Sequence, residues 1–367
     1  MQHALRLLLK TRMPAIYAAV LLLVTPLSSL TPVSHAQEQL NTGHIAVIMP
    51  LKSDSLGRQA DAVRRGALQA AAANKEGPAV VVHATSDDLK DILATYNRAV
   101  QEGAQAVIGP LSRTAVNALA RGGKIRIPTL ALNAIDSEIV IPRQLYSFGL
   151  QIDSEAKQLA RIAAKKGLRR ALVVRADTPV SSRIVEAFKS EWSELGGTIV
   201  EQIPYASDST QLIKLRDKTQ AVQADLVLLA LDSSRARTVR PYIGGAISVF
   251  ATSLAYASND PLENFDLEGV IFVDMPWLLI PDHPAVITYN QVAAFTTLEI
   301  QRFYALGIDA YRIAVELVRP ALKIDDEPLD GVTGLVMRGQ NQGFVRELTP
   351  AEFHNGVARV MADTVFR

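Results

Sequence analysis

Residues 170–205 read RALVVRADTPVSSRIVEAFKSEWSELGGTIVEQIPY, and this stretch decides the fold class. Its first apolar run, 171–174, is short and rich in valine, which is typical of a buried parallel strand. Thr178 can cap a helix whose first turn suits the proline that follows, and apolar side chains recur at helical spacing over 184–195. Two glycines can then end that helix without strain, and residues 198–203 are again strand-like. The stretch therefore predicts a strand–helix–strand unit with a right-handed crossover.

A looser copy of this unit lies upstream. Residues 45–49 and 79–83 have the pattern of strands, and residues 59–74 between them have the pattern of a helix. Strands and helices continue to alternate on both sides of residue 150, which is typical of mainly parallel sheets covered by helices. The sequence therefore predicts an α/β protein with two Rossmann-like lobes, each a parallel sheet flanked by helices.

The final part of the chain departs from this alternation. Residues 285–306 and 308–322 show two helical patterns with no strand between them, so we expect two helices that return to the first lobe. Two strand-like segments follow over 335–348. Thr349, the proline after it and a glutamate three residues on make a helix-start signal, which predicts a last helix over 351–362.

These patterns divide the chain into three parts. We expect a signal peptide over residues 1–36, a first lobe from 37–150 plus 285–325, and a second lobe from 151–284 plus 326–367. Basic residues near the start, an apolar stretch too short to span a bilayer and a small-x-small cleavage site indicate the signal peptide. A membrane anchor is the alternative for that stretch, but prolines interrupt its apolar run. We therefore expect export to the periplasm, with no membrane span after cleavage.

Composition narrows the possible partners. The chain has 367 residues, of which 49% are hydrophobic and 20% charged, and its formal net charge is +1. This length suits two domains, and the absence of a basic tract argues against a nucleic-acid partner. The chain has no cysteine, which excludes disulfides, thiolate metal sites, a cysteine nucleophile and a lipid-modified N-terminal cysteine.

No motif for catalysis is complete in the chain. The nucleophile elbow G-x-S-x-G, the H-E-x-x-H zinc motif, the EF-hand loop, the Walker A loop and the dinucleotide fingerprint do not occur. The histidines are scattered, and none has a second ligand at metal spacing. Residues 154–157 match S-x-x-K, the nucleophile motif of penicillin-binding enzymes, but its S-D-N and K-T-G partners are missing, so a helix start capped by Asp153 or Ser154 is the simpler interpretation. We therefore predict no catalytic residue, no metal and no cofactor, and a protein that is not an enzyme.

The topology also predicts where a small polar ligand would bind. In parallel α/β lobes, ligands lie beyond the carboxyl ends of the strands, in the cleft between the lobes. The candidate residues at these ends are Ser112, Arg113, Thr114 and Asn133 in the first lobe, and Asp177, Asp232, Thr252 and Ser253 in the second. Ser112 precedes a helix and could hold an anion or simply cap that helix. Asn133 follows a strand, where asparagine is also common in turns.

Six segments in order carry a resemblance to a known family. They are AVIGPLSRTAV at 106–116, IPTLALN at 127–133, LYSFGLQIDSEAKQLA at 145–160, SSRIVEAFKSEWSELGGTIV at 181–200, RFYALGIDAYRIA at 302–314 and GVTGLVMRGQNQGFVRELTPAEFHNG at 331–356. Together they resemble the C-terminal domain of LpoA-type activators of class A penicillin-binding proteins, within the type 1 periplasmic-binding-protein fold.

The resemblance implies a non-catalytic periplasmic regulator that contacts a class A penicillin-binding protein and so supports peptidoglycan synthesis. Two features differ from the family's pattern. Family members are outer-membrane lipoproteins, whereas this chain has no cysteine to acylate. They also carry an N-terminal helical-repeat domain, whereas the α/β pattern here starts close to the predicted cleavage site.

The alternative hypothesis is an amino-acid-type solute receptor for an ABC importer. Receptors of this fold that bind branched-chain amino acids hold the ligand carboxylate with hydroxyl and backbone groups of the first lobe, which Ser112, Thr114 and Asn133 could supply. The ligand amine needs an acidic group on the second lobe, and Asp177 or Asp232 could supply it.

Overall fold

The computed structural model describes residues 43–122, 124–289, 297–319 and 322–361. The predicted signal peptide lies outside the described residues. Within these ranges, no helix is both long enough and apolar enough to cross a membrane.

The first sheet is parallel throughout, with its strands in the order β2-β1-β3-β4-β5. The strands are β1 (His44–Met49), β2 (Val80–Ala84), β3 (Ala104–Ile108), β4 (Thr129–Ala131) and β5 (Leu145–Ser147). The helices are α1 (Gly57–Ala73), α2 (Leu89–Gln101), α3 (Arg113–Gly122) and α11 (Leu298–Leu317). Alternate residues of β1 enter different apolar clusters: Ile45 packs with α1 and α11, whereas Ala46 packs with α2 and α3. The predicted parallel sheet covered on both faces is therefore confirmed.

The second sheet runs in the order β15-β14-β10-β9-β8-β6-β7, and all its pairs are parallel except those of β14 and β15. The strands are β6 (Arg170–Arg175), β7 (Thr198–Pro204), β8 (Leu226–Ala230), β9 (Ser248–Ala251), β10 (Val270–Asp274), β14 (Thr349–His354) and β15 (Val357–Val360). The helices are α4 (Ile152–Lys165), α5 (Pro179–Glu194), α6 (Ser209–Ala221) and α7 (Ser233–Val239). Helices α4 and α5 cover one face, and α6 and α7 cover the other.

The predicted strand–helix–strand unit is confirmed as β6, α5 and β7. Thr178 accepts a hydrogen bond from the Ser181 N–H at 3.2 Å, and a proline follows in the first turn. Gly196 has a φ of +79°, the left-handed conformation expected after a helix. Trp192 is fully buried, and its Nε1–H donates to the carbonyl of Thr198 at 3.1 Å.

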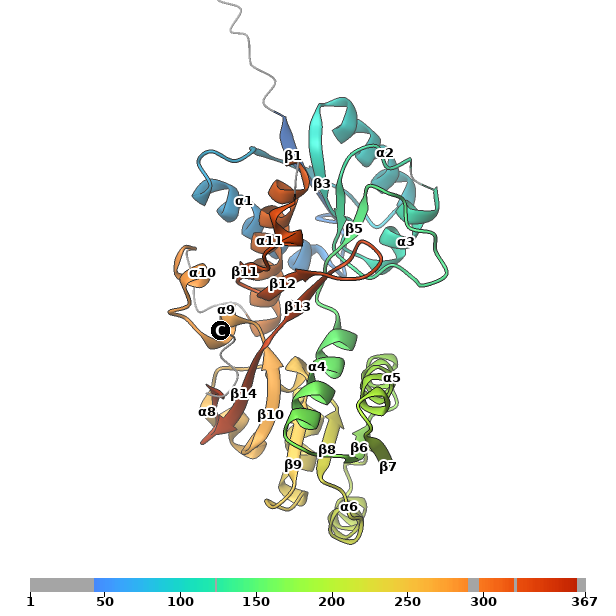
Figure 1. Cartoon of the computed structure of the whole chain (residues 1–367), viewed down its shortest axis with the longest axis vertical. Coiled ribbons are helices and arrows are strands. Elements are labelled where there is room, and N and C mark those ends of the chain that lie inside the picture. Colours follow the sequence, from blue (N-terminus) through green and yellow to red (C-terminus); the bar gives the residue numbers. More distant parts are fainter. Residues whose placement is uncertain (1–42, 123, 290–296, 320–321, 362–367) are drawn as a thin grey trace, which may run out of the picture. The chain divides into compact units, whose positions relative to one another are not determined.

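A third, antiparallel sheet lies between the last helix and the end of the chain. It consists of β11 (Leu329–Gly331), β12 (Gly334–Arg338) and β13 (Phe344–Glu347). Figure 1 shows β13 running on into β14 of the second sheet. The short helices are η1 (Arg240–Tyr242), η2 (Ser253–Ala255), α8 (Pro261–Asn264), η3 (Phe265–Leu267), α9 (Pro276–Leu279), α10 (Pro284–Ile287) and η4 (Lys323–Asp325).

The helix predicted over 351–362 is wrong, because these residues form strands β14 and β15 as far as Val360. Strand β14 pairs antiparallel with β10 as part of the second sheet, and Ala351 and Phe353 are fully buried in the apolar cluster beneath α6 and α7. The turn after β14 places Asn355 at a φ of +51° and ends the strand. Pairing with a distant strand outweighs the local helix-start signal at Thr349.

The predicted division into helices over 285–306 and 308–322 is wrong, although residues 290–296 and 320–321 lie outside the described residues. The expected return to the first lobe is confirmed, because α11 packs on α1. A short helix, α10, is separate, and one continuous helix, α11, includes Gly307. A β-carbon on Gly307 would lie 2.1 Å from the carbonyl oxygen of Val63, and one on Gly66 would lie 2.0 Å from that of Tyr304. Glycine is therefore present at this position because α1 and α11 approach backbone to backbone, not because the helix ends there.

This close approach makes Gly307→Ala destabilising. Alanine in an exposed helix interior is normally more stable than glycine by about 1 kcal/mol, but here the added methyl group overpacks the helix contact. We expect the free energy of unfolding to fall by about 1 to 3 kcal/mol, measured by urea denaturation. Gly122→Ala is the control, since among the described residues no atom outside its chain neighbours and its own helix backbone lies within 4 Å of a β-carbon there. A stabilised Gly307→Ala protein would contradict the close approach.

Candidate functional site

Two predicted site residues of the first lobe hold the loops after β3 and β4 together. The Ser112 hydroxyl accepts from the Ala115 N–H at 3.3 Å and so caps α3. The Asn133 side chain donates to the carbonyl of Leu111 at 3.1 Å and accepts from the Ala134 N–H at 2.9 Å. The structure thus brings the two strand ends together, but both side chains already bond to the backbone.

The other two candidates of the first lobe differ in their surroundings. Arg113 forms an ion pair with Asp136, with 2.7 Å between the Arg113 Nη2 and a carboxylate oxygen. Hydrogen bonding from Arg113, helped by Asn117, lowers the pKa of Asp136. Thr114 is exposed to solvent.

The candidates of the second lobe are dispersed. Asp177 is exposed, whereas Asp232 caps α7 by accepting from the Arg235 N–H at 2.9 Å and pairs with the Arg235 guanidinium. Thr252 is fully buried, and its hydroxyl has no hydrogen-bond partner among the described residues. Ser253 is also buried and bonds to Glu155, so neither of these two hydroxyls faces solvent.

A buried ionic cluster, which the sequence patterns did not predict, is formed by Glu155, Ser253, Asp274 and Arg302. Arg302 extends from α11, and its Nη2 lies 2.5 Å from a carboxylate oxygen of Asp274, the last residue of β10. The Arg302 Nε lies 3.2 Å from each oxygen of the same carboxylate. Its Nη2 also donates to the carbonyls of Ser253, at 3.2 Å, and Tyr256, at 2.7 Å. These contacts of the guanidinium join α11 to the second sheet and its loops.

Glu155 completes the ionic cluster from α4. One carboxylate oxygen accepts from the Ser253 N–H at 2.9 Å, and the other accepts from the Ser253 hydroxyl at 3.1 Å. Burial raises the pKa of Glu155 to about 7, and the nearby Asp274 carboxylate adds to the increase. Burial likewise raises the pKa of Tyr256 to about 12. The cluster therefore contains a carboxyl group that titrates near neutral pH.

Two further buried polar side chains fix the segment that carries β11 to β14. Asp309 of α11 is fully buried and accepts from the N–H groups of Val332, at 3.2 Å, and Thr333, at 2.8 Å, and from the Thr333 hydroxyl at 2.6 Å. Gln158 of α4 bonds to both backbone groups of Leu348, donating at 2.7 Å and accepting at 3.0 Å. Helices α4 and α11 therefore each hold this segment in place.

The sequence contains a pattern from which the buried positions of Glu155 and Gln158 could be predicted. Glu155 and Gln158 occupy inward positions of α4, beside Ala156 and Leu159, where apolar side chains are expected. The S-x-x-K match drew attention to Ser154 and the exposed Lys157 instead. The predicted cap was wrong as well, because α4 begins at Ile152 after Gln151, whose side chain makes no capping bond.

Asp153 has a different role from the predicted cap, because it pairs with Arg183 of α5. No group of three or more metal-ligating side chains gathers anywhere in the described ranges.

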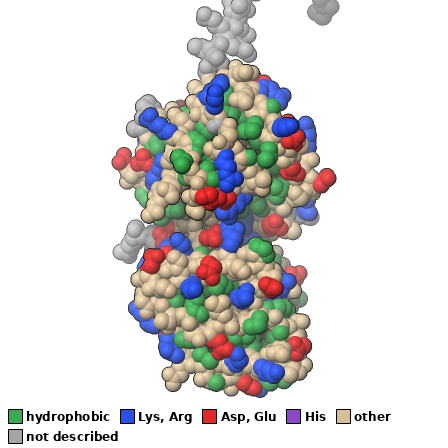
Figure 2. All heavy atoms as spheres, turned by 90° about the vertical axis from the view of Figure 1, so that its right-hand side faces the viewer, with side chains coloured by type: hydrophobic (Ala, Val, Ile, Leu, Met, Phe, Trp, Pro, Cys, Tyr) green, Lys and Arg blue, Asp and Glu red, His purple; other side chains and the backbone are tan. Residues whose placement is uncertain are grey.

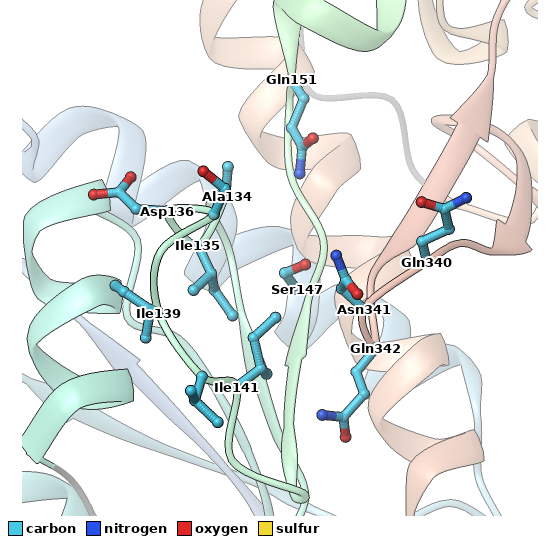
Figure 3. A pocket seen from close by; sticks show the side chains of 12 residues that line it. Ala134, Ile135, Asp136, Ile139, Ile141, Ser147, Gln151, Gln340, Asn341 and Gln342 are labelled. Carbon is cyan, nitrogen blue, oxygen red and sulfur yellow. The ribbon is translucent and has the colours of Figure 1, made fainter.

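A pocket of about 470 Å³ lies beside the carboxyl ends of β4 and β5. One wall is the loop from Ala134 to Ile141, and the opposite wall is the tip of the β12–β13 hairpin, Gln340 to Gln342. In Figure 3, Ser147 and Gln151 lie on the chain segment between these walls, and Asn341 of the hairpin lies beside Ser147. The pocket thus adjoins the predicted ligand-binding loop at Asn133.

Comparison with known proteins identifies the family. The sequence profile of the "LppC putative lipoprotein" family matches residues 10–356. The chain belongs to the LppC family. Curated relatives named "Penicillin-binding protein activator LpoA" include that of Haemophilus ducreyi, 27% identical over 87% of this chain and 54% of its own length. That of Haemophilus influenzae is 26% identical over 87% of this chain and 55% of its own length. This LppC-family chain therefore spans about half the length of these curated relatives.

Solved structures show the same architecture. A protein described as a putative branched-chain amino acid ABC transporter from Chromobacterium violaceum is 36% identical, with a TM-score of 0.75 over 85% of the LppC-family chain and 100% of its own. The C-domain of Haemophilus influenzae LpoA, described as a regulator of PBP1A, has a TM-score of 0.72 over 87% and 100% of the two chains. Its 22% identity shows the fold alone. These matches confirm the predicted two-lobed, type 1 periplasmic-binding-protein architecture.

Removing Arg302 tests the ionic cluster. We expect Arg302→Ala to lower the free energy of unfolding by about 3 to 5 kcal/mol, because it leaves the buried Asp274 carboxylate and two carbonyls without their donor. The control is Arg319→Ala, just beyond α11, where the Arg319–Glu316 pair is half exposed and contributes less than about 1 kcal/mol. Equal effects of the two substitutions in urea denaturation would contradict a structural role for the buried pair.

The raised pKa of Glu155 predicts a pH dependence of stability. Between its ordinary value of 4.5 and about 7, the folded chain holds a proton on Glu155 that the unfolded chain has released. The stability contributed by this proton is complete below pH 4.5 and is lost as the pH rises through 7. As the pH rises from 4.5 to above 7, the loss of this contribution lowers the free energy of unfolding by up to about 3 kcal/mol.

Glu155→Gln isolates that contribution, because the amide keeps a hydrogen-bonding group at the site and cannot ionise. We expect the variant and the native chain to have similar stability at pH 5, and the variant to be more stable at pH 8. The measurement is the difference between their urea denaturation midpoints across this range. A difference that does not change with pH would show that Glu155 does not titrate there.

Proposed function

We propose that this chain is a non-catalytic regulator of peptidoglycan synthesis that acts in the periplasm by contact with a class A penicillin-binding protein. The observation that carries the proposal is the LppC family match over residues 10–356, together with relatives named as penicillin-binding protein activators. These relatives are named as activators and not as enzymes. Since the chain spans about half their length, the proposal assigns the contact with the synthase to this half.

The geometry at the strand ends supports a regulator over a receptor. Ser112 and Asn133 bond to backbone groups, Asp232 is paired with Arg235, and Ser253 binds Glu155. A ligand would have to displace these bonds, and at the buried Ser253 leaving a polar group unpaired costs about 1 to 3 kcal/mol. Figure 2 shows acidic and basic side chains interspersed on the face in view, so no charge of one sign dominates this face.

The location and domain boundaries remain part of this proposal. We infer that residues 1–36 are removed on export and that the chain acts in the periplasm. The first lobe then comprises 37–150 plus 285–325, and the second comprises 151–284 plus 326–367.

A binding and activity assay tests the regulator. The purified chain is mixed with the periplasmic region of a class A penicillin-binding protein, and retention on an affinity column is measured. Glycan polymerisation and cross-linking by the synthase are then measured with and without the chain. We expect retention and a faster rate of at least one reaction. If the chain is not retained and neither reaction changes its rate, the proposal is wrong.

The second candidate is a solute-binding receptor for amino acids. It is favoured by the 36% identity to the Chromobacterium violaceum protein, which is described as a putative branched-chain amino acid ABC transporter. The exposed Thr114 and Asp177 are the predicted site residues left free to meet a solute.

Thermal unfolding in the presence of single amino acids separates the two candidates. A ligand at 100 times its dissociation constant stabilises a protein by about 2.7 kcal/mol. A clear rise in melting temperature with one amino acid, and no effect on the synthase, would favour the receptor.

A further inference from the structure

We propose that the pocket beside β5 binds a short, uncharged peptide segment through its backbone amide groups. This site is separate from the eight residues predicted at the strand ends, and the inference does not depend on whether the chain is a regulator or a solute receptor. Its volume of about 470 Å³ falls within the range of about 300 to 1,000 Å³ usual for small-ligand sites.

The polar groups of the pocket are amides and hydroxyls. Asn341 belongs to the hairpin wall, whereas Ser147 and Gln151 belong to the chain segment that runs between the two walls (Figure 3). Among the residues that the structure describes, the side chains of Gln151 and Asn341 form no hydrogen bond. Each amide offers two donors and an acceptor. A peptide group presents its N–H and its C=O in opposite directions, so amides on two neighbouring segments can bond to both.

The pocket offers no free charge among its described lining residues. Asp136 is its charged lining residue, and this carboxylate is paired with Arg113. In Figure 3 the Asp136 side chain points away from Ser147 and Asn341. A free amino acid or another ion would lose hydration there without gaining an opposite charge. The ligand must therefore be neutral where it is held.

The apolar part of the pocket suits an aliphatic side chain. Ile135, Ile139 and Ile141 line the wall opposite the hairpin. No aromatic ring lines this pocket within the described ranges, so a sugar would lack the flat surface on which its ring usually packs. Amides on one side and isoleucines on the other fit a peptide with small aliphatic residues.

The turn at the hairpin tip has two central residues in the left-handed conformation, and neither is glycine. The Gly343 N–H donates to the Gln340 carbonyl at 2.9 Å, and the two residues between them have φ values of +51° at Asn341 and +58° at Gln342. This is the turn geometry in which glycine is preferred at the second central position. Gln342 occupies that position, and its amide donates to the carbonyl of Pro142 at 3.2 Å, which ties the hairpin to the opposite wall.

The hairpin also prevents a ligand from adding to the sheet as an extra strand. Strand β5 is at the edge of the first sheet, but the Ser147 N–H already donates to the Gln342 carbonyl at 3.3 Å. A peptide in this pocket is therefore bound by side-chain amides and not by the backbone at the edge of β5.

An NMR titration of the full chain tests the proposal. The probe is an N-acetylated, C-amidated dipeptide of leucine and alanine, and the signals observed are the side-chain NH₂ groups of Gln151 and Asn341. We expect both signals to shift with a single dissociation constant. Asn341→Gly keeps the left-handed turn without strain, and Gln151→Ala removes no capping bond. Each variant is expected to bind the probe about fivefold to tenfold more weakly.

Matched controls separate binding in this pocket from binding elsewhere on the chain and from binding of another ligand class. Gln202→Ala, on the exposed part of β7, should leave probe binding unchanged. Free leucine and an N-acetylglucosamine trimer are titrated in parallel. Stronger binding of either one than of the blocked dipeptide would overturn the assigned ligand class. No shift at millimolar probe, or shifts that persist unchanged in both pocket variants, would overturn the site.

Discussion

The buried contact between Arg302 and Asp274 is the constraint on which the rest of the structure depends. A guanidinium removed from water needs its charge and its N–H groups satisfied together, and here a carboxylate and two carbonyls do so. These acceptors come from the end of β10 and the loop after β9. The helix that supplies Arg302 also packs backbone to backbone on α1 through Gly307. One helix is thus fixed to both sheets by contacts that tolerate little change.

Glu155 makes this arrangement responsive to protons. It lies near Asp274, whose carboxylate pairs closely with Arg302, while the charge of Arg346 partly opposes the rise in the pKa of Glu155. Burial disfavours a second negative charge beside Asp274, which is why the pKa of Glu155 is about 7. The Ser253 N–H and hydroxyl partly offset this cost by bonding to the carboxylate. The contact between α4 and η2 therefore includes a carboxyl group whose protonation changes near neutral pH.

Local pattern predicted the layered fold well, and long-range pairing explains where it failed. The strand–helix–strand unit at β6, α5 and β7 followed from period and capping alone. Strand β14 did not, because its burial depends on β10, far away in the sequence, while its own residues carry a helix-start signal. The site shows the same limit. Topology predicted that Ser253 lies at a strand end, but its partner Glu155 is 98 residues away, and no local rule connects them.

The way polar groups are used at the strand ends bears directly on function. A receptor that encloses a solute needs hydroxyls, amides and carboxylates that are free until the ligand arrives. In this chain Ser112 caps a helix, Asn133 joins two loops, and Ser253 is bonded within the ionic cluster. These bonds stabilise the loops without a ligand, whereas the amides of Gln151 and Asn341 remain unbonded among the described residues. A chain whose strand-end groups already stabilise the fold is better suited to present a fixed surface to a partner than to close on a small molecule.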